Sequence, residues 1–254
     1  MPFIQVLHLG QVDYATALKL QKTLAELRKQ NRIADVMLLL EHSPVITLGR
    51  NSDEKNVVVS RELLAQRGVE VFETDRGGDV TYHGPGQLVG YPICDLRALP
   101  PKVNEETGEE KRIGPVEFVR RMEEALIRAC IEFGLGTERV AGRTGVWTLA
   151  SATSPEMKVA AIGVHISRGV TSHGFALNVA TELEDFKLIV PCGISDKPVT
   201  RLADHIEPEH MPSMEQVMNA VTRQWGNVFG VQVLWLESLE ALMSAQKKNE
   251  CANQ

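Results

Sequence analysis

Residues 76–87, R-G-G-D-V-T-Y-H-G-P-G-Q, combine a high density of glycine with side chains that form hydrogen bonds. Four glycines and one proline within this stretch require sharp turns or a close approach of the backbone to another group. The flanking stretches, 69–73 and 88–94, are typical of strands. A polar, glycine-rich connection between two strands is a frequent place for a binding site. The pattern alone leaves open a second interpretation, a long hairpin loop with solvated polar side chains.

Two further residues could take part in covalent chemistry. Cys192 follows a proline and precedes a glycine, which suits a thiol presented from a loop and equally suits the end of a strand. Lys158 opens a predicted strand at its boundary with a polar loop, where a lysine is by default a solvated charge. Cys94 and Cys130 fall among apolar residues and are expected to be buried, inert thiols. Cys251 lies in a polar tail with nothing nearby to activate it.

The first half of the chain predicts short strands with two helices between them. Asp13 is the expected N-cap of a helix that runs to about Gln30, and Ser60 is the expected N-cap of a brief helix that ends at Gly68. Pro44 prevents the apolar residues on either side of it from forming one continuous helix. The predicted strands cover residues 3–9, 35–40, 45–48, 69–73 and 88–94, with a short extended piece at 57–59.

The second half begins with a charged stretch without aromatic residues, 97–114, which is expected to be a mobile surface insertion. A helix is predicted over 115–133, followed by three strands at 145–150, 158–166 and 170–179 with a hairpin turn at 167–169. Residues 181–187 predict about one helical turn. The C-terminal third predicts a helix with a capping box at Ser213 and Gln216, a strand over 231–236 and a last helix from about Ser238.

Composition predicts a soluble globular protein, and the length of the chain allows either one large domain or two small ones. The chain has 254 residues, 43% hydrophobic and 24% charged, with a net charge of -6. This acidic balance argues against nucleic acid as a partner. The four cysteines form no CxxC pair, so a structural zinc site is not expected, and free thiols fit a reducing compartment. The sequence shows neither a signal peptide nor a membrane-spanning run, and we expect a cytoplasmic protein without membrane attachment.

Taken together, the motifs resemble those of the octanoyltransferases of lipoate biosynthesis. The glycine-rich stretch continues as L-V-G-Y, and four more motifs follow in order: G-R-T-G-V-W, K-V-A-A-I-G, H-G-F-A-L-N-V and P-C-G-I. The resemblance covers about residues 5–202. The charged insertion near 100–114 and the loop 151–157 are longer than the family pattern needs, and neither interrupts a motif.

The resemblance implies a fold and a set of site residues. The fold is expected to be α+β, a mixed β-sheet with packed helices, similar to the catalytic domains of biotin and lipoate protein ligases. It is expected to form a single catalytic domain over residues 1–254, with a loosely held C-terminal tail. Cys192 matches the family's acyl-thioester cysteine, and Lys158 matches the lysine that lowers its pKa. The segments that match the family's substrate-binding positions contain Arg76, Gly77, Gly78, Asp79, Val80, Thr81, Tyr82, His83, Ala161, Ile162, Gly163, Gly174, Phe175 and Ala176.

The activity implied by this likeness is transfer of an octanoyl group from acyl carrier protein to a lysine of a lipoyl domain, the first step of endogenous protein lipoylation. The expected acceptors are the lipoyl domains of 2-oxoacid dehydrogenases and the glycine cleavage H protein. No cofactor and no metal is expected. Two alternatives are an ATP-using lipoate or biotin ligase, which would not need the thiol, and a binding module that forms no covalent acyl species.

The chemistry suggests further assignments. Small residues, Ala161, Gly163 and Ala176, are expected to line a dry slot for the acyl chain. His83 could be catalytic, but its expected role is to hold the glycine-rich stretch by hydrogen bonds. His173 is expected to be a strand residue, and it could also position that stretch opposite Lys158. A local basic rim for acidic partners is expected from Arg76, Arg143, Arg168, Lys187, Lys197 and Arg201.

Overall fold

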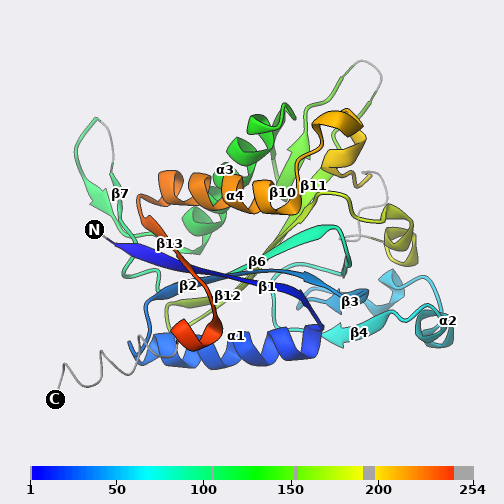
Figure 1. Cartoon of the computed structure of the whole chain (residues 1–254), viewed down its shortest axis with the longest axis horizontal. Coiled ribbons are helices and arrows are strands. Elements are labelled where there is room, and N and C mark those ends of the chain that lie inside the picture. Colours follow the sequence, from blue (N-terminus) through cyan, green and yellow to red (C-terminus); the bar gives the residue numbers. More distant parts are fainter. Residues whose placement is uncertain (1, 104–105, 152–153, 191–197, 243–254) are drawn as a thin grey trace.

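An eight-stranded mixed sheet with helices on both faces forms the centre of the molecule (Figure 1). The computed structural model describes residues 2–103, 106–151, 154–190 and 198–242. The strand order is β13-β1-β2-β6-β12-β11-β10-β9. β1 pairs in parallel with β13 and β2, whereas the other neighbours in the sheet are antiparallel. The strands are β1 (Phe3–Val12), β2 (Asp35–His42), β6 (Gln87–Ile93), β9 (Thr137–Val140), β10 (Arg143–Thr148), β11 (Lys158–Ser167), β12 (Val170–Asn178) and β13 (Gln232–Leu236). The expected α+β fold with a mixed sheet is therefore confirmed.

Three long helices cover the two faces of this sheet. α1 (Tyr14–Lys29) packs on one face, and α3 (Pro115–Glu132) and α4 (Met214–Phe229) pack side by side on the other (Figure 1). Their starts follow the sequence signals: the Asp13 side chain accepts a hydrogen bond from the Thr16 N–H, and Ser213 forms the predicted capping box. Within the described residues, no helix is both long and apolar enough to cross a membrane.

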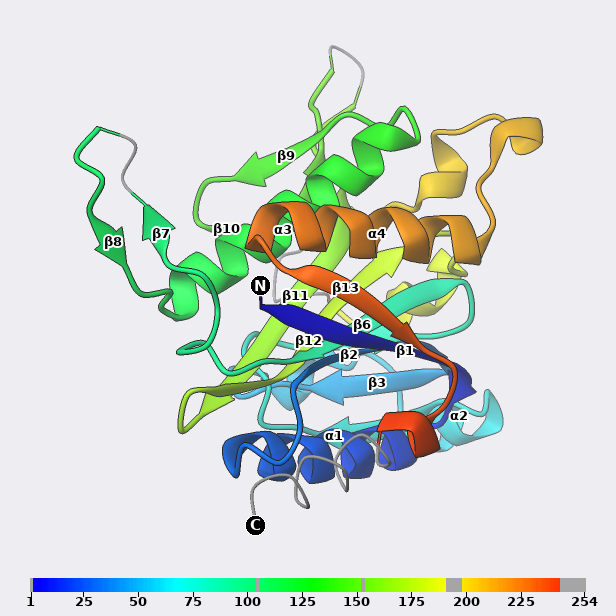
Figure 2. The same ribbon diagram turned by 60° about the vertical axis from the view of Figure 1, so that its left-hand side comes forward.

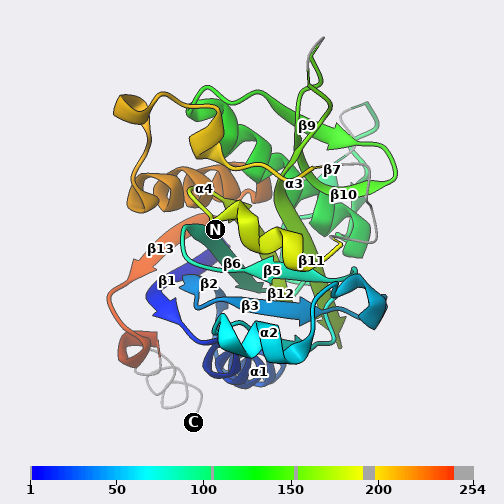
Figure 3. The same cartoon turned by 90° about the vertical axis from the view of Figure 1, so that its right-hand side faces the viewer.

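A second, smaller sheet lies beside the first and corrects the hairpin-loop interpretation of residues 76–87. It consists of β4 (Glu70–Glu73), β3 (Val45–Leu48) and β5 (Thr81–His83), and its neighbours include α2 (Arg61–Gln66) and a 3-10 helix, Leu183–Leu188 (Figure 3). β4 therefore does not pair with β6, because the two strands belong to different sheets. The glycine-rich stretch crosses from one sheet to the other and contains a strand of its own, β5, which pairs antiparallel with β3.

Other elements differ from the sequence prediction in detail. The stretch 57–59 does not form a strand. Val57 makes an isolated bridge with Ile189, and a 3-10 turn, Glu54–Asn56, precedes it. The insertion 97–114 contains a hairpin of β7 (Lys102–Val103) and β8 (Glu110–Lys111), which projects from the body (Figure 2).

The meander of the second half is confirmed, with an additional edge strand, β9, that the pattern did not predict. The β11–β12 turn has positive φ at both central residues, 52° at Arg168 and 85° at Gly169, as tight hairpins require. The expected helical turn at 181–187 is the 3-10 helix at Leu183–Leu188. The last helix is described only from 239 to 242.

Candidate active site

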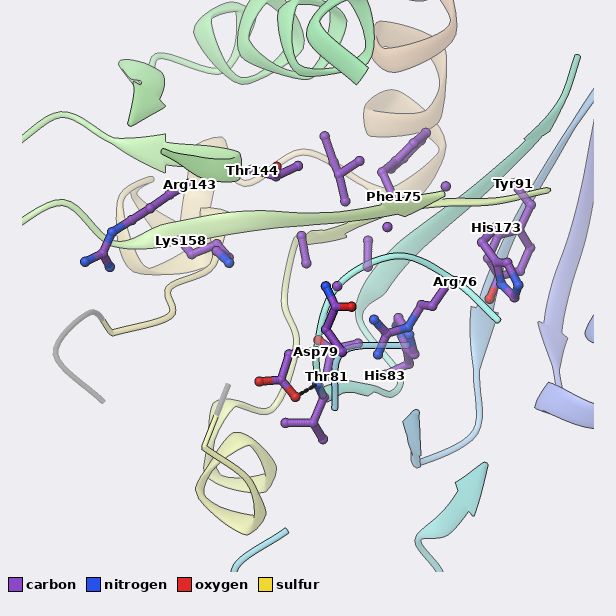
Figure 4. Close-up of a pocket in the computed structure, with 18 of the residues that line it drawn as sticks. Arg76, Asp79, Thr81, His83, Tyr91, Arg143, Thr144, Lys158, His173 and Phe175 are labelled. Atoms are coloured by element: carbon purple, nitrogen blue, oxygen red, sulfur yellow. Dashed lines mark hydrogen bonds between the residues drawn. The ribbon is translucent and has the colours of Figure 1, made fainter. Parts of the chain in front are cut away.

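A cavity of about 330 Å³ lies between β11 and β12 of the large sheet and the segment 76–83 that crosses to the small sheet (Figure 4). Thirteen of the fifteen described site residues expected from the sequence line it. They are Lys158, Arg76, Gly78, Asp79, Val80, Thr81, His83, Ala161, Ile162, Gly163, Gly174, Phe175 and Ala176. One cavity therefore brings together three motifs that are separated by up to about a hundred residues in the chain.

Close backbone contacts explain why glycines stand where the segment crosses the sheet. The Gly77 N–H donates to the Val164 carbonyl of β11 at 3.0 Å. A Cβ at Gly163 would lie 2.5 Å from the Gly77 oxygen, and a Cβ at Gly49 would lie 2.4 Å from the Gly78 oxygen. Side chains at Gly163 or Gly49 would push the crossing segment away from the middle of β11 and from the end of β3.

Arg76 anchors this segment. Its side chain is buried, and its guanidinium donates to the Thr47 carbonyl at 2.6 Å, to the Thr47 hydroxyl and to the Gly77 carbonyl. Arg76 therefore cannot contribute to an exposed basic rim, and that part of the prediction is wrong. Lys197 lies outside the described residues.

Two residues of the expected binding segments do not line the cavity. Gly77 makes its contacts with β11, as described above. The Tyr82 side chain points to the opposite side of its strand, where the hydroxyl donates to Asp185 at 2.8 Å and the ring packs edge-on against Phe186. Alternation of side chains along β5 explains the difference, because Thr81 and His83 face the cavity and Tyr82 between them does not.

Lys158 lies at one end of the cavity, beside Arg143 (Figure 4). It is only 9% exposed, and its Nζ atom is 4.7 Å from the centroid of the Trp147 ring. The default interpretation of Lys158 as a solvated charge is therefore wrong.

The chain that follows Cys192 returns to Lys158. The backbone N–H of Lys158 donates to the Pro198 carbonyl at 2.9 Å, and the Thr200 N–H donates to the Lys158 carbonyl. Cys192 itself lies outside the described residues. Of the described cysteines, Cys94 and Cys130 are fully buried, as expected, and burial raises the pKa of the Cys130 thiol to about 12.

Two buried imidazoles, those of His173 and His83, lie at the other end of the cavity beside Arg76 (Figure 4). Burial lowers the pKa of His173, whose Nε2–H donates to Asp75 at 2.8 Å. Burial, followed by repulsion from His42, lowers the pKa of His83 to about 3, so this imidazole is neutral and donates through Nδ1–H to Gln87. His83 and Gln87 both belong to the glycine-rich stretch, and His173 contacts the residue just before it.

Sequence reasoning did not include seven residues of the cavity wall among the binding positions. Five of them stand in motifs that were recognised, so the signal was present: Tyr91 in the L-V-G-Y that continues the glycine-rich stretch, Gly142, Arg143 and Thr144 in G-R-T-G-V-W, and His173 in H-G-F-A-L-N-V. Nothing in the local pattern marks the other two, Tyr14 and Asn51, which reach the cavity only through tertiary packing.

Comparison with known proteins identifies the family of this chain. The family model of the lipoyl protein ligase A/B catalytic domain matches residues 13–226. The octanoyltransferase of Acidobacterium capsulatum is 61% identical over 235 residues, which are 92% of this chain and 94% of that protein. The octanoyltransferase of Koribacter versatilis is 61% identical over 240 residues, 94% of this chain and 90% of that protein.

Solved structures share the fold at low sequence identity. A bipartite lipoate protein ligase of Thermoplasma acidophilum superposes with a TM-score of 0.69 at 16% identity and covers 98% of this chain and 92% of its own. A lipoate-protein ligase A bound with ATP gives a TM-score of 0.68 at 15% identity, covering 98% and 94%. The chain belongs to the lipoyl protein ligase A/B catalytic-domain family and, within it, to the octanoyltransferases, which are acyltransferases of lipoyl biosynthesis.

Proposed function

We propose that this protein transfers an octanoyl group from acyl carrier protein to a lysine of a lipoyl domain through a thioester on Cys192. The observation that carries the proposal is the burial of the Lys158 amine at one end of a cavity whose middle is lined by small and apolar residues. A buried cation beside an apolar slot suits a reaction that joins a charged nucleophile to an acyl chain.

The dimensions of the slot support an octanoyl chain. Seven carbon–carbon bonds of about 1.5 Å give a chain shorter than about 11 Å. β11 rises about 3.3 Å per residue, so the five steps from Lys158 to Gly163 span about 17 Å. Burial of six methylene groups against Ala161, Ala176 and Phe175 would contribute about 5 kcal/mol of binding free energy.

In the first half of the reaction, the Cys192 thiolate attacks the carbonyl carbon of the octanoyl thioester. The new carbon–sulfur bond forms as the bond to the carrier thiol breaks, and the Lys158 ammonium gives its proton to the departing thiolate. The bond energies of the two thioesters are nearly equal, so the step needs no ATP. The Lys158 backbone lies against Pro198 and Thr200, and Pro198 follows Cys192 by six residues, so covalent geometry limits their separation to about 20 Å.

In the second half, the acceptor lysine attacks the octanoyl-Cys192 thioester as a neutral amine. The amide bond forms, Cys192 leaves as a thiolate, and the neutral Lys158 amine accepts the proton that the attacking nitrogen releases. This restores the ion pair with which the cycle began. The proposed acceptors are the lipoyl domains of 2-oxoacid dehydrogenases and the glycine cleavage H protein.

The intact mass of the protein after mixing with octanoyl-acyl carrier protein, without acceptor or ATP, tests this proposal. The expected result is a gain of one octanoyl group on Cys192 that hydroxylamine removes. The Cys192→Ala variant should neither gain the group nor transfer it, whereas Cys130→Ala, which changes a buried thiol, should do both. Transfer that requires ATP, or that proceeds in the Cys192→Ala variant, would contradict the thioester mechanism.

Alkylation of Cys192 by iodoacetamide tests the pairing with Lys158. If the Lys158 ammonium stabilises the thiolate, the Lys158→Ala variant should show a Cys192 pKa closer to the free-thiol value of about 8.5 and slower alkylation at neutral pH. Arg121→Ala, which removes a largely buried cation that pairs with Glu117 outside the cavity wall, provides the control. Identical alkylation profiles for the parent protein and Lys158→Ala would contradict the pairing.

A further inference from the structure

The G-R-T-G-V-W stretch contains a tryptophan to which the proposed reaction gives no role. Trp147 is 1% exposed, and two cations lie near its ring: Lys158 Nζ is 4.7 Å and Arg143 Cζ is 5.9 Å from the ring centroid. A cation within about 6 Å of an aromatic face is attracted by the negative potential of that face. Trp147 therefore contacts Lys158 through an electrostatic interaction as well as through packing.

An irregularity in strand pairing brings the two residues together. Val146 of β10 lies opposite Ala160 of β11, whereas Trp147 lies opposite Lys158. β11 thus advances by two residues while β10 advances by one, which leaves Val159 as the extra residue of a β-bulge. A bulge beside a site redirects a side chain, and here it places Lys158 across from the indole.

A buried carboxylate fixes the part of β10 that precedes the tryptophan. Glu123 of α3 is completely buried, and its Oε1 atom accepts a hydrogen bond from the Gly145 N–H at 3.0 Å. Gly145 has a φ of +123°, and a Cβ there would lie 2.6 Å from the Ala160 oxygen and 3.6 Å from Lys158 Cε. The backbone of β10 is therefore held close against the lysine side chain.

We propose that Trp147 is a positioning residue for Lys158: its indole face holds the ammonium group at the end of the cavity, and Glu123 holds, through Gly145, the strand segment that carries the indole. A lysine side chain has four flexible methylene links, so a fixed aromatic face reduces the number of positions that its amine samples. The face also favours the charged amine, which is the form that a neighbouring thiolate needs. This inference depends on the proposed function only for the role of Lys158 in the reaction.

Fluorinated tryptophan separates the electrostatic role from a purely structural one. Tetrafluorotryptophan has nearly the shape of tryptophan, but its ring face is no longer negative. We expect its incorporation at position 147 to raise the rate at which acetic anhydride labels the Lys158 amine, at fixed pH, by roughly twofold to fivefold. Trp225 is the matched control, because it is equally buried but stacks on Phe229 with a centroid separation of 4.1 Å.

The labelling rate, measured by mass spectrometry of the peptide that contains Lys158, does not depend on octanoyl transfer. An equal Lys158 labelling rate with tryptophan and tetrafluorotryptophan at position 147 would overturn the inference, whatever the transfer activity. A raised rate in a protein that forms no octanoyl adduct would support the inference and contradict the proposed function.

Aromatic and aliphatic replacements give a second comparison. Trp147→Phe should keep Lys158 labelling closer to the parent rate than Trp147→Leu, because only phenylalanine retains a negative ring face. Equal labelling rates in the two variants, with both folded by circular dichroism, would also overturn the inference.

Discussion

At the level of single residues, selection for the length of the acyl chain is expected to depend on two alanines that lie side by side on neighbouring strands. Ala161 of β11 and Ala176 of β12 are direct partners in the sheet, and both line the cavity. The structure makes Gly163, which the sequence suggested as a third wall residue, unsuitable for testing this point. A side chain there would first displace the Gly77 carbonyl.

Ala161→Leu should therefore shorten the preferred acyl chain. The three added carbons would occupy space next to Thr81 and Ala176, and we expect kcat/KM for octanoyl transfer to fall by about tenfold or more relative to hexanoyl or butanoyl transfer. The measurement is transfer from a series of acyl-carrier thioesters. Ala203→Leu, a partly exposed alanine outside the cavity wall, should leave the chain-length preference unchanged. An unchanged preference in a folded Ala161→Leu protein would remove this residue from the slot.

Sequence reasoning was most successful where a residue type is chemically unusual in its context. The glycine-rich stretch was recognised because glycines cluster there with hydrogen-bond donors, whereas the two alanines were recognised through the family motifs K-V-A-A-I-G and H-G-F-A-L-N-V. It was least successful in predicting the direction in which a side chain points. Tyr82 belongs to the recognised stretch yet faces Asp185, because the sequence did not predict the three-residue strand β5 and its alternation of side chains.

At the level of elements, the crossing of the segment 76–83 over β11 determines the shape of the cavity. The sequence predicted the neighbouring strands but not that β4 and β6 belong to different sheets. Pairing between strands that are distant in the chain has no local signal, whereas strand periodicity and helix caps such as Asp13 do. The glycines at this crossing were visible in the sequence, but their contact partners were not.

Gly163→Ala should disturb this crossing. Its Cβ would lie 2.5 Å from a backbone oxygen that cannot rotate away, so the crossing segment must shift, and we expect a loss of about 1–3 kcal/mol in the free energy of unfolding. Octanoyl transfer should decrease as well, because Gly78 and Asp79 move with the segment. The measurements are urea unfolding and transfer rate.

Gly136→Ala is the matched control for this substitution. A Cβ at Gly136 would meet the Leu149 side chain at 2.9 Å, but that side chain is 54% exposed and can turn away. If Gly163→Ala were as stable as Gly136→Ala, the close approach of the backbone at the crossing would not be a constraint.

At the level of the whole molecule, a cluster of buried rings joins the helix and both sheets. Tyr14 at the start of α1 packs against His42 at the end of β2 and against His83 of β5. The Tyr91 hydroxyl of β6 donates to His42 Nε2 at 2.7 Å. The sequence could not predict this cluster, since its members come from four separate elements. His83 and Tyr91 stand in one recognised motif, but the pattern gives no sign that they contact Tyr14 and His42. Its histidines are neutral because they are buried, which links the stability of the whole fold to pH.

Acid should therefore begin to destabilise the protein at a pH well above the range in which its carboxylates titrate. Burial lowers the pKa of His42 to about 4, and burial with repulsion from His42 lowers that of His83 to about 3. The same side chains in the unfolded chain have a pKa of about 6.5. As pH falls below about 6.5, the unfolded state binds protons that the folded state does not, so the free energy of unfolding decreases down to the folded pKa values. Between pH 8 and pH 5, each histidine should account for a loss of about 2 kcal/mol.

Urea unfolding at pH 8 and pH 5 measures this loss, and the difference between the two values is the informative quantity. His42→Asn removes the acceptor of the Tyr91 hydroxyl and should lower stability at both pH values. Because it also removes one buried imidazole, it should reduce the difference between them by about 2 kcal/mol. His210→Asn, at an exposed position, should leave the difference as it is in the parent protein. The contradicting result is a difference in unfolding free energy between pH 8 and pH 5 that is the same in His42→Asn as in His210→Asn. His42 would then have to be accessible to protons in the folded protein, and the cluster of rings between the helix and the two sheets could not be sealed from solvent.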